Sequence, residues 1–463
     1  SVKHKVPFYR ESPMVRVVLL VLVVAVSAAG WLLHGAAKIG VGYSAKQLCS
    51  GVFVSHFPAE FVLENDILPR MATVAGMDRF VKAEVGTGSA TVKILTASAT
   101  ASYRKRYGCT LHGTQASTVD ALNAHAGPNV STNTVRSDNR AVESAIDALF
   151  EEPETGGRNT LAVLIMHKGK VVSERYAEPV GPNTRLQGWS MNKSLMASFV
   201  GVQVGKGQIA LSMPVRERLT ALEAPEHTTR DVSDALTLKH LMSMASGLDF
   251  DERYLPGDDV TEMLYGGVPM WHVPLAQGHR REPGQEFVYS SGDTNVVSYL
   301  WQASLGGAPY VDWVDREIND YLDLDDPLLE PDTSGVQVGS SFAYLTARDW
   351  ANYGQWWLDA WHGRDDILSQ EWQRLAVTPS DSADFYGLSF WLNTRLSDYP
   401  DLPANTFHAG GNSGQFVVVV PEAELVLVRL GLTLNEAAGL ADPFAKIYNA
   451  LTARDDLAVH VNE

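Results

Sequence analysis

An uncharged apolar run near the start of the chain is the strongest constraint on its fold. Residues 17–33 contain no charged side chain and are rich in Val and Leu. Extending the run to Ala37, across His34, gives the length of about 20 residues that a helix needs to cross a bilayer. The run therefore predicts a membrane-spanning helix, with the lipid bilayer as its partner.

The basic residues around this run predict its orientation. Four precede it and two follow it closely: Lys3, Lys5, Arg10 and Arg16, then Lys38 and Lys46. The positive-inside bias places the short N-terminus in the cytoplasm and the bulk of the chain in the periplasm or cell exterior. A cleaved signal peptide is the alternative, because residues 26–28 offer a small-residue cleavage site. We expect an uncleaved anchor formed by residues 1–38.

Composition excludes some partners for the rest of the chain. Among 463 residues, 54 are acidic and 37 basic, which gives a net charge of −17 and argues against nucleic acid or anionic lipid as the main partner. With 45% hydrophobic residues the chain can form a packed core, and its length suggests two or three units.

Two cysteines, Cys49 and Cys109, both follow the apolar run. An even pair in an exported region predicts a disulfide, and two buried free thiols are the alternative. Two cysteines without clustered histidines do not form a zinc site, and the sequence contains no H-E-x-x-H motif.

Pattern and composition divide the remainder into three parts. Residues 39–112 form a small region in which 80–85 and 90–95 predict a β-hairpin. Residues 113–140 are rich in Ser, Thr, Asn, Ala and Gly and predict a linker. Residues 141–455 predict a large α/β (α+β) domain with one antiparallel sheet built from both of its ends, beside a largely helical middle. Its expected strands are 161–166, 171–176, 386–393, 415–420 and 425–431, and its expected helices include 141–150, 238–244, 347–361 and 443–453.

The stretch from Gly188 to Gly207 carries the first candidate for chemistry. Ser190 and Lys193 lie three residues apart at the start of an expected buried helix, so both side chains share one face. A Lys in dry surroundings loses its charge and can take the proton of a Ser hydroxyl, which makes the Ser a nucleophile. The helix N-terminus also presents N–H groups to a developing oxyanion. A polar helix start with a solvated Lys is the alternative.

Two later stretches add candidates. Tyr289, in Tyr289-Ser290-Ser291, could act as a phenolate or a proton relay beside a neutral Lys, or simply be a packing residue. The glycine-rich stretch that begins at His408 could bring a strand edge close to a substrate and complete an oxyanion hole, or be a hairpin turn.

In this order the three stretches resemble the S-x-x-K, Y-x-N and K-T-G elements of the serine β-lactamase and penicillin-binding-protein superfamily. The stronger resemblance is to class C-like serine hydrolases, which include esterases, D-aminopeptidases and 6-aminohexanoate-dimer hydrolases. Residues 238–248 and 283–287, and the step from Gly414-Gln415 into the next strand, add to it. The resemblance covers residues 141–455 and implies a β-lactamase-like sheet flanked by helices, with a helical subdomain.

The resemblance also implies roles for individual residues. Ser190 corresponds to the acylated nucleophile, Lys193 to its base and Tyr289 to the proton relay, and the N–H groups of Ser190 and Gly411 would form the oxyanion hole. It implies neither a metal nor an organic cofactor. The expected substrate-binding residues are Trp189, Ser291, His408 and Gly410.

Two positions depart from the family pattern. Ser291 replaces an Asn, and His408 replaces a Lys. Because a His with an ordinary pKa of about 6.5 is mostly neutral at pH 7.5, the site lacks a lasting charge for a substrate carboxylate. This departure favours small esters or amides over β-lactams.

Other features have a simpler interpretation. The acidic cluster after residue 248 could attract an amine-bearing substrate, but we interpret it as a solvated loop; it comprises Asp249, Asp251, Glu252, Asp258 and Asp259. Trp189 could line the pocket or belong to the core.

The sequence thus predicts a membrane-anchored serine hydrolase with a small ester or amide substrate. A catalytically silent scaffold on the same fold, and a true β-lactamase or D-Ala peptidase, are the alternatives.

Overall fold

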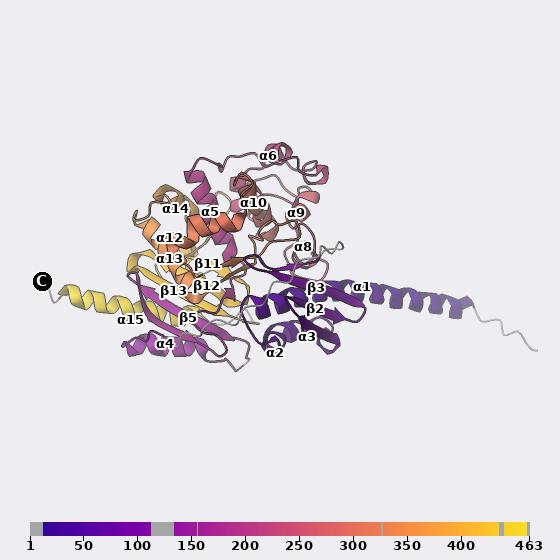
Figure 1. Cartoon of the computed structure of the whole chain (residues 1–463), viewed down its shortest axis with the longest axis horizontal. Coiled ribbons are helices and arrows are strands. Elements are labelled where there is room, and N and C mark those ends of the chain that lie inside the picture. Colours follow the sequence, from indigo (N-terminus) through magenta and orange to yellow (C-terminus); the bar gives the residue numbers. More distant parts are fainter. Residues whose placement is uncertain (1–12, 113–133, 155, 326, 435–438, 461–463) are drawn as a thin grey trace, which may run out of the picture.

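The computed structural model describes residues 13–112, 134–154, 156–325, 327–434 and 439–460, so most of the predicted linker 113–140 lies outside the described residues. The described residues form an α/β body, and the first half of helix α1 projects from it (Figure 1).

Helix α1 spans Pro13–Phe53, so it continues well past the predicted anchor. Among the described residues it is the one helix long and apolar enough to cross a membrane. The side chains described between residues 14 and 35 are exposed, whereas almost all of those from Ala37 to Phe53 are buried or partly buried. The boundary expected at residue 38 therefore falls inside one continuous helix. Small residues explain the close packing of the second half: a Cβ at Gly42 would collide with the carbonyl oxygen of Tyr265.

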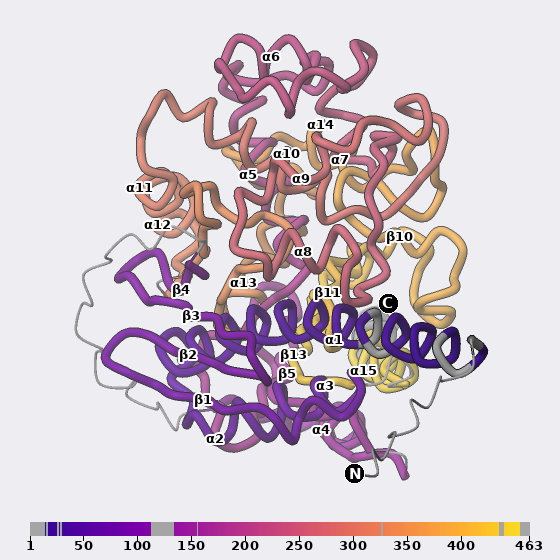
Figure 2. The backbone as a smooth tube through the Cα atoms, turned by 90° about the vertical axis from the view of Figure 1, so that its right-hand side faces the viewer, coloured from indigo at the N-terminus to yellow at the C-terminus, as the bar shows by residue number. Residues whose placement is uncertain are grey.

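A four-stranded antiparallel sheet packs against this buried half of α1 (Figure 2). Its first two strands form the predicted hairpin. Cys49 of α1 and Cys109 of the last strand form the predicted disulfide, and both residues are fully buried. The elements of this region are β1 (Val81–Gly86), β2 (Ser89–Ile94), β3 (Ala97–Arg104), β4 (Gly108–Leu111), α2 (Ala59–Val62), the π-helical turn η1 (Leu63–Ile67) and α3 (Leu68–Thr73).

The main sheet has six antiparallel strands in the order β10-β11-β12-β13-β5-β6, assembled from both ends of the large domain as the sequence predicts. Both faces are covered. Ala162 and Leu164 of β5 pack in the core cluster that contains α13, whereas Val163 and Ile165 pack against α4 and α15. The strands are β5 (Thr160–His167), β6 (Lys170–Tyr176), β10 (Trp391–Leu392), β11 (Phe407–Gly411), β12 (Gln415–Val420) and β13 (Leu425–Gly431).

The predicted strand 386–393 is mostly wrong, because only Trp391 and Leu392 join the sheet. Ser389 has a φ of 63°, in the left-handed region, and this interrupts the extended chain. The amide of Gly387 instead donates to the carbonyl of Phe390, which closes a turn.

Helices from the middle of the domain lie on one side of the main sheet, and among them α5 and α10 carry the first two candidate stretches (Figure 1). The helices of the large domain are α4 (Arg140–Phe150), α5 (Met191–Gly205), α6 (Val215–Ala221), α7 (Leu238–Met242), α8 (Asp259–Tyr265), α9 (His272–Ala276), α10 (Ser291–Ala303), α11 (Tyr310–Val314), α12 (Asp320–Leu322), α13 (Ala347–Trp361), α14 (Gln370–Ala376) and α15 (Ala441–His460). A small sheet joins β7 (Leu186–Gln187), β9 (Ala343–Leu345) and β8 (Leu328–Leu329).

Candidate active site

Ser190 is the N-cap residue of helix α5, and the side chain of Lys193 lies in the first turn of that helix. The helix has apolar residues on every face, with a few polar ones among them, and is buried from Met191 to Gln203. A helix that is hydrophobic all round belongs in the core, and this position shields Lys193 from water. Only 1% of Lys193 is exposed, whereas Ser190 keeps partial exposure.

The ammonium group of Lys193 has three hydrogen-bond acceptors. Its Nζ lies 3.1 Å from Oγ of Ser190, 3.0 Å from Oγ of Ser291 and 3.1 Å from the carbonyl oxygen of Ser340. These three partners match the three N–H donors of a lysine ammonium. In the neutral amine, a lone pair can instead accept the proton of the Ser190 hydroxyl.

Burial allows the neutral amine to form near neutral pH. Desolvation lowers the pKa of Lys193 from 10.5 to about 8, although the carboxylates of Glu252 and Asp293 act in the opposite direction. A base with a pKa near the working pH is suited to proton transfer. The pair of Ser190 and Lys193 can therefore exchange a proton at neutral to mildly alkaline pH.

Tyr289 lies beside this pair. Its hydroxyl hydrogen-bonds to Ser190, and its ring centroid is 4.8 Å from Nζ of Lys193. Burial raises the pKa of the Tyr289 hydroxyl well above its usual value. Of the two roles considered from the sequence, this environment favours a neutral phenol that passes a proton over a phenolate base.

Gly411, at the end of β11, brings a second backbone segment to Ser190. A Cβ built at Gly411 would collide with the carbonyl oxygen of Gly188 and lie 3.2 Å from the backbone nitrogen of Ser190, so only glycine allows this approach. The backbones of Ser190 and Gly411 therefore lie close together at the N-terminus of α5. The two N–H groups that the sequence suggests for an oxyanion hole therefore belong to neighbouring backbone segments.

The structure buries two residues that the sequence suggested for substrate binding. Trp189 is 4% exposed and packs in the core with residues of α1 and the small sheet, so its ring offers little surface to a substrate. His408 is also 4% exposed, between the rings of Trp391 and Tyr399. Burial lowers the pKa of His408 to about 3, so its ring is neutral at any ordinary pH.

Ser291 and Gly410 differ in their access to the site. Ser291 is fully buried and contacts Nζ of Lys193. It therefore lies behind Lys193 in the site and does not offer a surface to a substrate. Gly410 is partly exposed at the edge of β11, next to Gly411.

Glu252 belongs to the site, contrary to the solvated loop expected from the sequence. Its carboxylate accepts hydrogen bonds from the backbone N–H and the hydroxyl of Ser291, at 2.8 and 2.6 Å. The hydroxyl of Tyr254 donates to the same carboxylate at 3.1 Å. A chain of contacts therefore runs from Glu252 through Ser291 to Lys193 and Ser190. The acidic cluster gave no signal that would single out Glu252 from its neighbours.

A comparison with protein families identifies the fold. A family model described as Beta-lactamase matches residues 145–447, which is well over half of the chain. The chain belongs to the β-lactamase family. Its sheet and helices are accordingly a β-lactamase-like α/β fold, as the sequence motifs indicated. The family match begins after the small region that α1 and β1–β4 form.

Two relatives of this β-lactamase-family chain are named for different activities. It is 27% identical over 227 residues to a 6-aminohexanoate-dimer hydrolase of Paenarthrobacter ureafaciens, covering 46% of this chain and 56% of the relative. It is 24% identical over 177 residues to a β-lactamase of Pseudomonas fluorescens, covering 36% of this chain and 44% of the relative. The chain thus spans about half the length of these relatives.

Solved structures support the fold alone. A D-stereospecific amidohydrolase from a Streptomyces species superposes with a TM-score of 0.51 at 16% identity. The superposition covers 66% of this chain and 98% of that one.

The carboxylate of Glu252 should affect the pH at which kcat/KM rises. If neutral Lys193 is the base, kcat/KM rises as pH passes its pKa of about 8. Glu252→Gln removes a negative charge that favours the ammonium, so the pKa of Lys193 falls and the rise moves to lower pH. A pH profile of ester hydrolysis measures this shift.

Asp249→Asn provides the matched control, because Asp249 lies on the same acidic loop and pairs with Arg280 at the surface. Its profile should coincide with that of the wild type. Equal profiles for Glu252→Gln and the wild type would contradict the assignment of the pH dependence to Lys193.

Proposed function

We propose that this protein is a membrane-anchored serine hydrolase that cleaves small ester or amide substrates through an acyl-enzyme on Ser190. One observation carries the proposal: a buried Lys193 with a pKa near 8 lies 3.1 Å from a partly exposed serine hydroxyl at a helix N-terminus. The relationship to a 6-aminohexanoate-dimer hydrolase supports hydrolysis of an amide or related bond.

In the proposed reaction, neutral Lys193 takes the proton of the Ser190 hydroxyl while Oγ attacks the substrate carbonyl carbon. The N–H groups of Ser190 and Gly411 stabilise the oxyanion that develops on the carbonyl oxygen. Tyr289 then passes a proton to the leaving alcohol or amine and takes in its place the proton that Lys193 removed from Ser190. The C–O or C–N bond breaks, the acyl group stays on Ser190 as an ester, and Lys193 is neutral again. Water attacks the acyl-enzyme by the same route, which releases the acid and restores Ser190.

The anchor and the disulfide support an extracytoplasmic location for this chemistry. Helix α1 carries the apolar run, its flanking charges predict a cytoplasmic N-terminus, and Cys49 and Cys109 are oxidised. We propose that the catalytic domain of residues 141–455 lies in the periplasm or outside the cell, behind the region 39–112 and the linker 113–140.

Short-chain esters should be hydrolysed at least tenfold more efficiently than cephalosporins. A cephalosporin carboxylate needs a positive partner near the glycine-rich stretch that begins at His408. His408 is buried and neutral, so it does not supply one. A charge-assisted hydrogen bond in a partly closed site contributes about 1.5–3 kcal/mol, which corresponds to roughly ten- to a hundredfold in kcat/KM.

The measurement compares kcat/KM at pH 7.5 for a short-chain nitrophenyl ester and a chromogenic cephalosporin. A tenfold advantage for the cephalosporin would instead favour a true β-lactamase, the activity named for the Pseudomonas relative. Failure to hydrolyse either substrate, or a panel of other esters and amides, would favour a catalytically silent scaffold.

A further inference from the structure

The small N-terminal region contains a buried polar cluster, the Asp66 cluster, formed by Tyr43, Gln47, Asp66 and Arg70. Asp66 is 5% exposed and lies in η1. Its carboxylate accepts from the hydroxyl of Tyr43 at 2.6 Å, from Nε2 of Gln47 at 3.1 Å and from Nε of Arg70 at 2.9 Å. A buried carboxylate with three donors holds their side chains in fixed positions.

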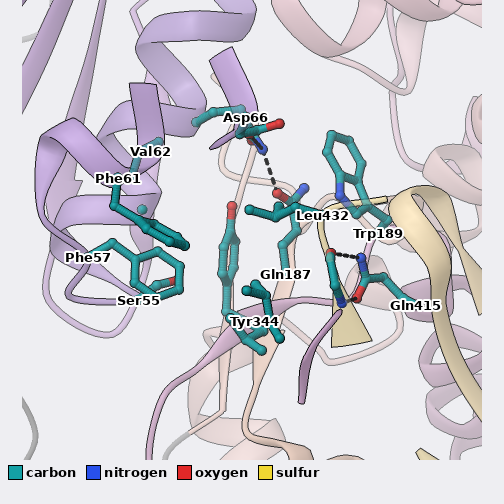
Figure 3. Close-up of a pocket in the computed structure, with 15 residues that line it drawn as sticks. Ser55, Phe57, Phe61, Val62, Asp66, Gln187, Trp189, Tyr344, Gln415 and Leu432 are labelled. Atoms are coloured by element: carbon teal, nitrogen blue, oxygen red, sulfur yellow. Dashed lines mark hydrogen bonds between the residues drawn. The ribbon is translucent and has the colours of Figure 1, made fainter. Parts of the chain in front are cut away.

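Two members of the Asp66 cluster reach into the catalytic domain. Nε2 of Gln47 lies 2.9 Å from Oε1 of Gln187, at the end of β7. Nη2 of Arg70 lies 2.5 Å from Oγ of Ser413, in the turn η6 (Asn412–Gly414). Figure 3 shows Asp66, Gln187, Trp189 and Gln415 around one pocket between the two parts of the molecule.

These two contacts adjoin the two backbone segments that meet at the active site. Gln187 lies three residues before Ser190, and Ser413 lies two residues after Gly411. The Asp66 cluster therefore holds the chain beside each of the two expected oxyanion donors.

The turn that carries Ser413 is also held from inside the catalytic domain. Arg429, fully buried in β13, donates to the carbonyl oxygens of Ser413 at 3.2 Å and Gly414 at 2.7 Å. Nε2 of Gln415 donates to the carbonyl oxygens of Asn412 and Ser413, both at 3.1 Å. The hydroxyl of Ser413 contacts Arg70, so the Asp66 cluster adds a side-chain contact to a turn that Arg429 and Gln415 hold by its carbonyl groups.

We propose that the Asp66 cluster positions the oxyanion hole. The region 39–112 then contributes to catalysis by holding the backbone of the active site in place. The inference rests on the proposed function for its catalytic consequence. Arg70, Asp66 and Gln47 are positioning residues, because they act through Ser413 and Gln187 and not on the substrate. Misplacing oxyanion donors weakens transition-state stabilisation more than substrate binding.

The test uses the full-length protein in detergent or nanodiscs, with Arg70→Ala and Ser413→Ala as the two variants. Removing one oxyanion-hole donor costs about 10²–10³ in kcat, so displacing donors should lower kcat by about ten- to a hundredfold with little change in KM. Arg70→Lys keeps a cation for Asp66 and Ser413 and should recover part of the loss.

Arg106→Ala is the matched control. Arg106 also joins the small region to the catalytic domain, through Asp312 at 2.8 Å and Asp315 at 2.5 Å, but it contacts α11 and the turn that follows α11 instead of the site. Its kcat should match the wild type. A loss in Arg70→Ala no greater than in Arg106→Ala would overturn the proposal.

Hydrogen exchange separates this proposal from the proposed function. The backbone amides of residues 407–416 should exchange faster in Arg70→Ala and Ser413→Ala than in the wild type or Arg106→Ala. Unchanged exchange there would overturn the positioning role even if the protein is a serine hydrolase. If Ser190→Ala kept full activity, the proposed function would fail, whereas the exchange experiment would still decide whether the Asp66 cluster holds the turn.

Discussion

Ser190→Ala should lower kcat for a short-chain ester by about 10⁴-fold or more, because the variant has no hydroxyl to form the acyl-enzyme. The oxyanion donors and the pocket remain, so residual catalysis above the uncatalysed rate is expected. The measurement is kcat for purified wild type and variant at the same pH. Circular dichroism should show an unchanged fold, since the hydroxyl of Ser190 lies at a partly exposed helix end.

Ser194→Ala is the matched control for this variant. Ser194 lies one turn further along α5 than Ser190, is buried and donates to the carbonyl of Ser389 at 2.7 Å, which is not among the hydrogen-bond partners of Lys193. Its loss costs stability through an unpaired buried carbonyl but should leave kcat within a few-fold of the wild type. Near wild-type turnover by Ser190→Ala would show that the proposed mechanism is wrong.

Lys193→Ala should be nearly as damaging as Ser190→Ala, because it removes the base that activates the nucleophile. Residues that act as one unit lose activity non-additively, so the double variant Ser190→Ala/Lys193→Ala should be no slower than the worse single variant. Steady-state kinetics on the three proteins measures this.

Lys193→Arg separates a base from a fixed positive charge. An arginine stays protonated at every working pH, so it can donate hydrogen bonds to Ser190 but cannot accept its proton. We expect no appreciable recovery over Lys193→Ala. Substantial turnover by Lys193→Arg would mean that the charge of Lys193 matters, and not its lone pair.

Local sequence patterns were enough to predict much of the catalytic domain. The helix 347–361 and the strands 415–420 and 425–431 have the predicted bounds, since their periodicity and flanking turn residues are encoded within each segment. The order of the three motifs was also enough to predict the family. It placed Ser190, Lys193 and Tyr289 in one site although about 100 residues separate the first two from the third.

Contacts between distant segments decide what the sequence could not predict. His408 lies in a glycine-rich stretch typical of a strand edge, but Trp391 and Tyr399 cover its ring. Glu252 differs from the other acids of its loop only because the fold brings Ser291 to it. The continuation of α1 depends on a sheet and a helix that follow it in the chain. Tertiary context of this kind leaves no local pattern.

The most direct test of the central claim is the site of covalent modification. The purified protein is treated with a fluorophosphonate, its intact mass is measured, and the modified peptide is sequenced by tandem mass spectrometry. We expect one adduct per chain, located on Ser190, absent from Ser190→Ala and formed faster as pH rises through about 8. An adduct on another residue, or equal labelling of wild type and Ser190→Ala, would contradict the assignment of Ser190 as the nucleophile.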